Sequence, residues 1–177
     1  VGEGTVPQIK ATLKKFGIAE VDLLSCCDAT FKQGIKFANW MDADKHGHNH
    51  FYYHPFSSPF PSGYDVTNYW LNNTADFEFS RLSEIYSVAE LNRSPKQKSS
   101  PPYVGAVDYA YHFNAVKFAE LLAKNAREKF SVKHTVETIE QVKIKPDGNI
   151  DGFVYADGRT ELFDFFVDCS GFSSLLL

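Results

Sequence analysis

The sequence predicts a mixed α/β fold, and three observations lead to this prediction. Residues 111–130 show the apolar spacing of a long amphipathic helix. Residues 132–171 are typical of a β-meander, with expected strands at 132–145, 150–156 and 160–171 separated by the turn sequences PDGN and DGR. Residues 31–40, FKQGIKFANW, alternate between apolar and other side chains in the manner of a strand.

Composition excludes several classes of protein. The chain has 177 residues, of which 44% are hydrophobic and 23% charged, enough for one domain with a substantial core. The net charge of −4 and the lack of a basic block argue against a nucleic-acid partner. No apolar run approaches the roughly 20 residues of a membrane helix, so we expect no membrane partner. The three cysteines form no disulfide framework, which favours a cytoplasmic location.

The first expected element is a helix over residues 5–17. Thr5 is a candidate N-cap, Pro7 suits the first turn, and Gly17 is a natural end. Gly2 and Gly4 precede this helix, and glycine allows a ligand to approach backbone N–H groups closely.

The second expected element is the strand at residues 31–40, in which Lys32 and Lys36 share one face. Phe31, Ile35 and other apolar side chains would form the opposite face. Lysine is rarely buried without a partner. Either both ammonium groups reach water, which is the simpler interpretation, or one of them works in a closed site.

Residues 41–69 are expected to form a long loop, and residues 93–105 a second irregular, exposed stretch. The first loop is rich in aromatic residues, which argues for a functional role rather than disorder. Its histidines at 46, 48, 50 and 54 match no zinc spacing, and we expect a polar loop and no metal site. High aromatic content, 15% overall, also suggests stacking surfaces for a flat ligand.

The long helix has a clear start. Asn114 is its expected N-cap, and Phe113 and Phe118 have the spacing of a hydrophobic staple. After the last expected strand, Gly171 marks a place where the backbone could turn close to a ligand.

This order of elements corresponds to the later part of a flavoprotein dinucleotide-binding domain. The GxGxxG fingerprint that should precede it is absent. The chain starts without Met and stops directly after a strand and turn, so we expect a fragment of a longer protein.

Six motifs make the resemblance more specific. VGEGTVP, FKQGIKFANW, YHPF, NRSP, YHFNA and DCSGF occur in the order and at the spacing of the flavin-dependent tryptophan halogenases, which the chain resembles over nearly its whole length. The resemblance implies a partial FAD-binding, flavin-monooxygenase-like fold over residues 1–177. Within it, residues 1–40 would carry the flavin loop and lysine strand, 41–111 a substrate-side insertion, and 112–177 the helix and meander.

The resemblance also implies a reaction. Reduced FAD from a separate flavin reductase, O2 and a halide ion yield hypohalous acid, which meets a small aromatic substrate beside one essential lysine. That lysine corresponds to Lys32, while Lys36 receives no role. A homodimer is compatible with the resemblance.

Further site residues follow from the same resemblance, with plain core packing as the alternative for each. The cofactor-binding candidates are Val1, Gly4 and Ile139. The substrate-binding candidates are Ile35, His54 and Phe56, the last two flanking a flat indole.

The sequence departs from the family pattern at three places. Ser173 and Ser174 replace Arg and Gly after DCSGF, GEGTVP replaces GEATIP, and the loop after Trp40 differs in sequence. These differences make free indole and other aromatics candidates beside tryptophan. The family's halide site falls beyond residue 177, so the chain alone is expected to be inactive.

Two other functions remain open from the sequence. One is an FAD-dependent aromatic monooxygenase without halide chemistry, which would have no need of Lys32. The other is a non-catalytic binding domain built on the aromatic loop.

Overall fold

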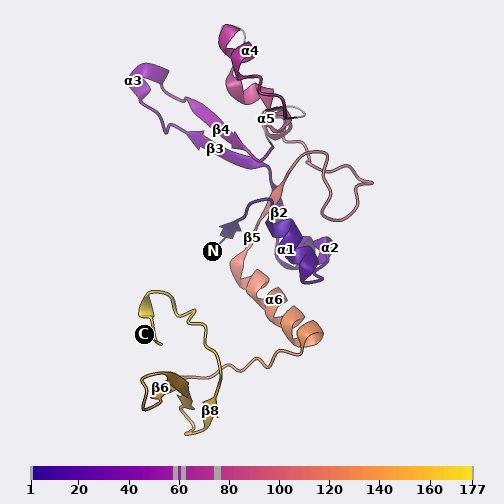
Figure 1. Cartoon of the computed structure of the whole chain (residues 1–177). Helices are drawn as coiled ribbons and strands as arrows, with labels where there is room; N and C mark the ends of the chain where they lie inside the picture. Colours follow the sequence, from indigo (N-terminus) through magenta and orange to yellow (C-terminus); the bar gives the residue numbers. More distant parts are fainter. Residues whose placement is uncertain (1, 58–59, 61–62, 74–76, 177) are drawn as a thin grey trace. The chain divides into compact units, whose positions relative to one another are not determined.

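The computed structural model describes residues 2–57, 60, 63–73 and 77–176. The chain divides into two units, Val1–Val132 and Lys133–Leu177, and Figure 1 labels many of their helices and strands. The mixed α/β class expected from the sequence is confirmed.

A three-stranded antiparallel sheet organises the first unit. Its strands are β1 (Gly2–Gly4), β5 (Ala110–Asn114) and β2 (Thr30–Lys32), in that order, so β5 is central. The sequence predicted a helix from residue 111, but residues 111–114 belong to this middle strand and the helix begins at Ala115. The sheet therefore joins three parts of the chain that are far apart in sequence.

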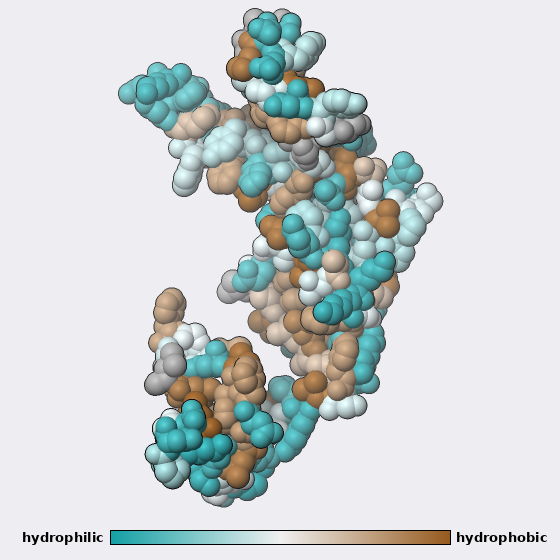
Figure 2. All heavy atoms as spheres, in the orientation of Figure 1, coloured by the Kyte–Doolittle hydropathy of each residue, from teal (hydrophilic) through white to brown (hydrophobic). Residues whose placement is uncertain are grey.

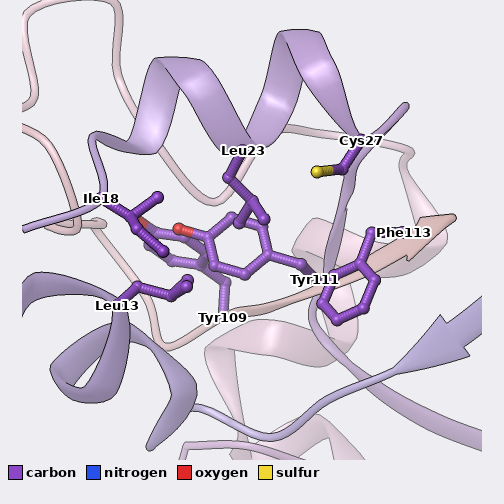
Figure 3. Close-up of a cluster of buried hydrophobic side chains, with 7 residues drawn as sticks. All are labelled: Leu13, Ile18, Leu23, Cys27, Tyr109, Tyr111 and Phe113. Carbon is purple, nitrogen blue, oxygen red and sulfur yellow. The ribbon is translucent and has the colours of Figure 1, made fainter. Parts of the chain in front are cut away.

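One face of this sheet builds the core. Tyr111 and Phe113 alternate with Ala110 and His112 along β5, and Tyr109 precedes them, so the aromatic side chains share one face. The helices α1 (Ile9–Lys15) and α2 (Glu20–Cys26) contribute Leu13 and Leu23. Figure 3 shows the two tyrosine rings lying between Leu13 and Leu23.

The long helix α6 (Ala115–Phe130) confirms the expected start. The Asn114 side chain accepts hydrogen bonds from the backbone N–H groups of Val116 (3.1 Å) and Lys117 (3.3 Å). The rings of Phe113 and Phe118 lie 4.3 Å apart between centroids, which confirms the staple. These local contacts fix the direction in which α6 leaves β5.

The first helix begins later than expected. α1 starts at Ile9 after Gln8, and Thr5 is not its cap. The Thr5 hydroxyl instead donates to the Tyr111 carbonyl oxygen (3.0 Å), next to the Thr5 N–H on the same oxygen (2.9 Å). Thr5 thus continues the β1–β5 contact, while Gly17 ends the helix region with φ 68° as predicted.

The single strand predicted at residues 31–40 is wrong, and so is the loop predicted at 41–69. The chain leaves the first sheet after Lys32 and forms a hairpin from β3 (Gly34–Ala38) and β4 (Phe51–Pro55). A short helix, α3 (Ala43–His46), lies between its strands, and the surface around α3 is hydrophilic in Figure 2. The segment FYYHP forms a strand that pairs with GIKFA, residue opposite residue. The prediction of a loop overlooked this strand.

Short helical elements follow the hairpin in the described part of residues 60–90. They are α4 (Thr67–Asn72), the 3-10 helix η2 (Phe79–Leu82) and α5 (Glu84–Glu90). Residues 93–105 have no helix or strand, as expected, but their exposure was predicted wrongly in part. Pro95 is fully buried, and the Lys96 side chain is only 12% exposed because it is paired with Glu20.

The second unit is the predicted β-meander. β6 (Ile139–Ile144), β7 (Ile150–Tyr155) and β8 (Thr160–Leu162) form an antiparallel sheet in sequence order. The last strand ends at Leu162, earlier than expected, and the 3-10 helix η3 (Gly171–Ser173) follows. Hydrophobic side chains gather on the visible surface of this unit (Figure 2), and Phe165, Val167 and Phe172 are among its exposed residues.

None of the described helices has the length and apolar character needed to cross a membrane.

Candidate functional site

Lys32 is the last residue of β2 and lies where three segments meet. It pairs with Ala110 of β5 in the sheet register. Its Nζ donates to the Thr5 carbonyl oxygen (3.0 Å) and lies 5.5 Å from the centroid of the Phe56 ring. Lys32 is half-buried, and its ammonium group has a neutral acceptor and a ring face beside it, but no carboxylate within ion-pair distance among the described residues.

The missing side chain of Gly4 leaves room for the Lys32 ammonium group. A methyl group at Gly4 would lie 3.3 Å from Lys32 Nζ and 3.1 Å from His112 Nδ1. Both distances are tighter than ordinary van der Waals contact, so a side chain at Gly4 would push one neighbour away. The predicted flavin-loop glycine and the predicted catalytic lysine are thus direct neighbours, although no relation between them was predicted.

Lys32 and Lys36 do not share a strand face, contrary to the sequence prediction. Lys32 lies in the first sheet, and Lys36 pairs with Tyr53 in the β3–β4 hairpin. The chain changes sheets at Gln33, whose Nε2 donates to the Arg93 carbonyl oxygen (2.8 Å). Alternation alone could not reveal this change because it continues unbroken through Gln33.

Lys36, which received no role from the resemblance, is paired with a carboxylate. Its Nζ lies 2.8 Å from Glu90 Oε1 and 3.8 Å from the centroid of the Phe51 ring. The Tyr53 hydroxyl donates to the same Glu90 oxygen. Hydrogen bonds from Lys36 and Tyr53 hold the pKa of Glu90 below its usual value. Burial raises the pKa of Tyr53, and the neighbouring Glu90 raises it further.

A largely aromatic cavity of about 760 Å³ lies beside the hairpin. It contains two of the predicted substrate residues, His54 and Phe56, together with Trp70 and Phe79. The Trp70 and Phe79 rings meet edge to face at 5.0 Å, and Trp70 Nε1 donates to the Phe77 carbonyl oxygen (3.1 Å). Aromatic walls of this kind suit a flat apolar ligand.

Ile35 is the register partner of His54 across the hairpin. Because Phe56 follows β4 directly and also lies beside Lys32, this end of the hairpin connects the cavity with the lysine. The three predicted substrate residues are therefore brought near one another, and two of them line the cavity.

A buried carboxylate network supports the strand opposite Lys32. Glu20 is 5% exposed and accepts hydrogen bonds from Lys96 Nζ (2.7 Å), the Tyr103 N–H (2.8 Å) and the hydroxyls of Tyr109 (2.6 Å) and Tyr111 (2.7 Å). Burial alone would raise the pKa of Glu20, but these donors outweigh it and the pKa is lowered. The tyrosines lie on both sides of Ala110, the partner of Lys32, so the network fixes this part of β5.

Two of the predicted cofactor residues, Val1 and Ile139, remain predictions. Val1 lies outside the described residues. Ile139 begins β6 of the second unit, pairs with Tyr155 and is 41% exposed. Gly4 is the one cofactor candidate that the structure places beside the lysine.

The histidine-rich segment forms a structural turn. His50 Nε2 accepts from the Met41 N–H (2.8 Å), and its Nδ1 lies 2.7 Å from the Gly47 carbonyl oxygen. Within residues 2–57, 60, 63–73 and 77–176, no group of three or more His, Cys, Asp or Glu side chains could hold a metal ion.

Sequence reasoning missed His112, Glu20 and the pocket residue Trp70. His112 and its strand could have been found, because Tyr109, Tyr111 and Phe113 alternate in the manner of a strand. Glu20 gave no signal, since its donors come from residues 96–111, far along the chain.

Comparison with known proteins identifies the family. The family model described as tryptophan halogenase matches residues 1–177, and the chain belongs to this family. It is 31% identical to tryptophan 7-halogenase RebH of Lentzea aerocolonigenes over 193 aligned residues, covering all of this chain and 36% of RebH. The resemblance seen in the six motifs is confirmed.

Solved structures agree with this assignment. A tryptophan halogenase from Shewanella frigidimarina is 34% identical, with a TM-score of 0.91 over 99% of this chain and 34% of its own. BrvH, a flavin-dependent halogenase from Brevundimonas, is 29% identical, with a TM-score of 0.83 over 99% of this chain and 36% of its own. The chain thus spans about a third of the length of these relatives.

Proposed function

We propose that this chain is the lysine-bearing part of a flavin-dependent halogenase domain, and that the complete protein halogenates tryptophan or a related indole beside Lys32. The observation that carries the proposal is the position of Lys32 Nζ, next to Gly4, Thr5 and the Phe56 ring. Lys36 is engaged by Glu90 and so does not compete for this role. Relatives whose names state tryptophan halogenation support the reaction class.

Reduced FAD, delivered by a separate flavin reductase, would supply the chemistry that turns O2 and halide into hypohalous acid. Val1, Gly4 and Ile139 are the residues that we assign to FAD. The bare backbone at Gly4 fits the close approach of a flat group, because a side chain there would already crowd its neighbours.

Lys32 acts on the oxidant. Its nitrogen hydrogen-bonds hypohalous acid or forms a haloamine, and either state holds the halogen at one position. A fixed position near one ring carbon is what makes attack selective, since free hypohalous acid reacts indiscriminately. The Thr5 carbonyl oxygen orients the ammonium group for this purpose.

The aromatic substrate would lie in the cavity that His54 and Phe56 line, with Ile35 near its edge. Stacking on Phe56 adds about 1 kcal/mol beyond the burial of ring area. The walls contact the flat ring that indole and tryptophan share, so the substrate proposal covers both.

An FAD-dependent aromatic monooxygenase is the alternative function. It would use the same cavity but would have no use for an ammonium group beside it. Lys32 is therefore the residue that discriminates between the two functions.

The test uses the full-length protein that contains this chain, with FAD, a flavin reductase, NADH and bromide. Tryptophan, indole and phenols are offered, and products are identified by mass. We expect the wild type to form halogenated product. We expect Lys32→Ala to oxidise reduced flavin without forming halogenated product. Oxygenated product formed equally by both proteins would overturn the proposal in favour of the monooxygenase.

A further inference from the structure

His112 lies in the central strand of the first sheet, on the face opposite to the core. Its neighbours Tyr111 and Phe113 are buried, and alternation along β5 places His112 on the other side. In the register it pairs with Gly4 of β1 and Thr30 of β2. Lys32 and its partner Ala110 belong to the same face, two residues further along.

The imidazole of His112 and the ammonium group of Lys32 approach one point from two strands. A methyl group at Gly4 would lie 3.1 Å from His112 Nδ1, 3.2 Å from its Cε1 and 3.3 Å from Lys32 Nζ. Both side chains therefore lie against the bare Cα of Gly4, and a side chain at this position would disturb them. Polar groups that do not touch directly can be connected by a water-mediated hydrogen bond.

Packing does not account for the imidazole. His112 is exposed, and within the part of the chain that the structure describes its ring makes no hydrogen bond or ion pair. A neutral imidazole offers one acceptor nitrogen and one N–H donor. His112 therefore has a proton-accepting nitrogen to offer to its surroundings.

Few charged groups lie around His112 among the described residues of the first unit. Lys32 faces it from β2, whereas Glu3 of β1 pairs with Phe113 and so belongs to the opposite face. At the start of α6, Lys117 is held by Asp28 at 2.7 Å. Lys32 is therefore the charged side chain that lies near the His112 ring at Gly4.

We propose that His112 is the proton-transfer residue for Lys32, an inference that rests on the proposed function. An ammonium nitrogen has no lone pair and must lose a proton before it can attack a halogen. His112 accepts this proton, directly or through one water, so that an N–H bond of Lys32 breaks and an N–H bond of imidazolium forms. The free amine then attacks hypohalous acid: the N–halogen bond forms, the halogen–oxygen bond breaks, and the departing hydroxide takes a second amine proton to leave as water.

The decisive experiment measures how fast the Lys32 nitrogen reacts in the full-length protein, independently of halogenation. Acetic anhydride acylates only the unprotonated amine, and peptide mass spectrometry reports the rate at Lys32 itself. His112→Asn keeps a polar side chain of similar size but cannot take up a proton. His48→Asn, at an exposed histidine of the hairpin turn, is the matched control.

At neutral pH we expect acetic anhydride to acylate Lys32 several-fold more slowly in His112→Asn than in the wild type, and equally fast in His48→Asn and the wild type. In strongly alkaline buffer the difference should vanish, because hydroxide then removes the proton in both proteins. An unchanged acylation rate in His112→Asn at neutral pH would overturn the proposal. His112→Gln serves as a second variant if His112→Asn fails to fold, judged by circular dichroism.

Halogenation gives the second readout. Loss of a general base costs on the order of 100-fold in rate, and we expect this loss in His112→Ala, with partial recovery on adding imidazole to the buffer. Full activity in His112→Ala would also contradict the role. If Lys32→Ala still halogenates, the proposed function fails, while the acylation result continues to report on His112 alone.

Discussion

Lys32 and Lys36, only four positions apart, are held by different sheets and have different partners. Lys32 Nζ bonds the Thr5 carbonyl oxygen at 3.0 Å, whereas Lys36 Nζ bonds the Glu90 carboxylate at 2.8 Å. A charge next to a carboxylate is satisfied, while a charge next to one carbonyl keeps donors available for a ligand. This difference is the physical basis for assigning chemistry to Lys32.

The Glu20 network should be a major contributor to the stability of the first unit. Glu20→Gln removes the charge that Lys96 needs and turns an amide N–H toward the tyrosine hydroxyls. Breaking a buried charge pair from one side costs about 3 kcal/mol, and we expect a loss of this size in urea unfolding of the full-length protein. Glu90→Gln, at a more exposed pair, should unfold close to the wild type.

The same carboxylate should make stability depend on pH. The pKa of Glu20 is lowered in the folded protein, so its contribution is complete above the unfolded pKa, about 4.3, and is lost as the pH falls through the folded value. Unfolding midpoints measured from pH 7 downward should therefore fall more steeply in the wild type than in Glu20→Gln. Parallel curves for the two proteins would show that Glu20 is not the group responsible.

The hairpin beside the cavity should depend on Gly34. A methyl group there would lie 2.8 Å from the His54 carbonyl oxygen, which is backbone and cannot move aside alone. Overpacking of this kind costs about 2 kcal/mol, so Gly34→Ala should open the β3–β4 pair and speed hydrogen exchange at its amides. Gly2→Ala is the control, because its methyl group would meet only an ordinary contact of 3.7 Å; equal exchange in both variants would refute this prediction.

The start of α6 should depend on Asn114. Its side chain serves two backbone N–H groups, and replacing a cap of this type by Ala costs about 1 kcal/mol. We expect Asn114→Ala to lower the free energy of unfolding by this amount and Asn114→Asp to restore most of it. A loss as large in Asn114→Asp would mean that the cap bonds are not the cause.

Local signals predicted the parts of the fold that depend on neighbouring residues. The cap and staple of α6 and the turns of the β-meander lie within a few residues of the elements they define. The failures have a different cause: strand alternation continues through Gln33, where the chain changes sheets, and Thr5 prefers a bond to Tyr111 over a helix cap. Both depend on contacts with segments remote in sequence.

The candidate site shows the same division. Lys32 was found through motifs, and its immediate surroundings at Gly4 and Phe56 involve residues that the motifs also named. The strand that carries His112 was detectable from its alternation, but the position of His112 beside Lys32 was not, since it arises only when β1 and β2 meet on β5. Pairing across a sheet cannot be read from one strand alone.

The central claim is that Lys32, and not Lys36, handles the oxidant. The most direct measurement compares Lys32→Met with Lys36→Met in the full-length protein, following flavin oxidation and halogenated product in the same reaction. Both variants should oxidise reduced flavin, and Lys36→Met should still form product while Lys32→Met forms none. Product formed by Lys32→Met at the rate of Lys36→Met would contradict the account.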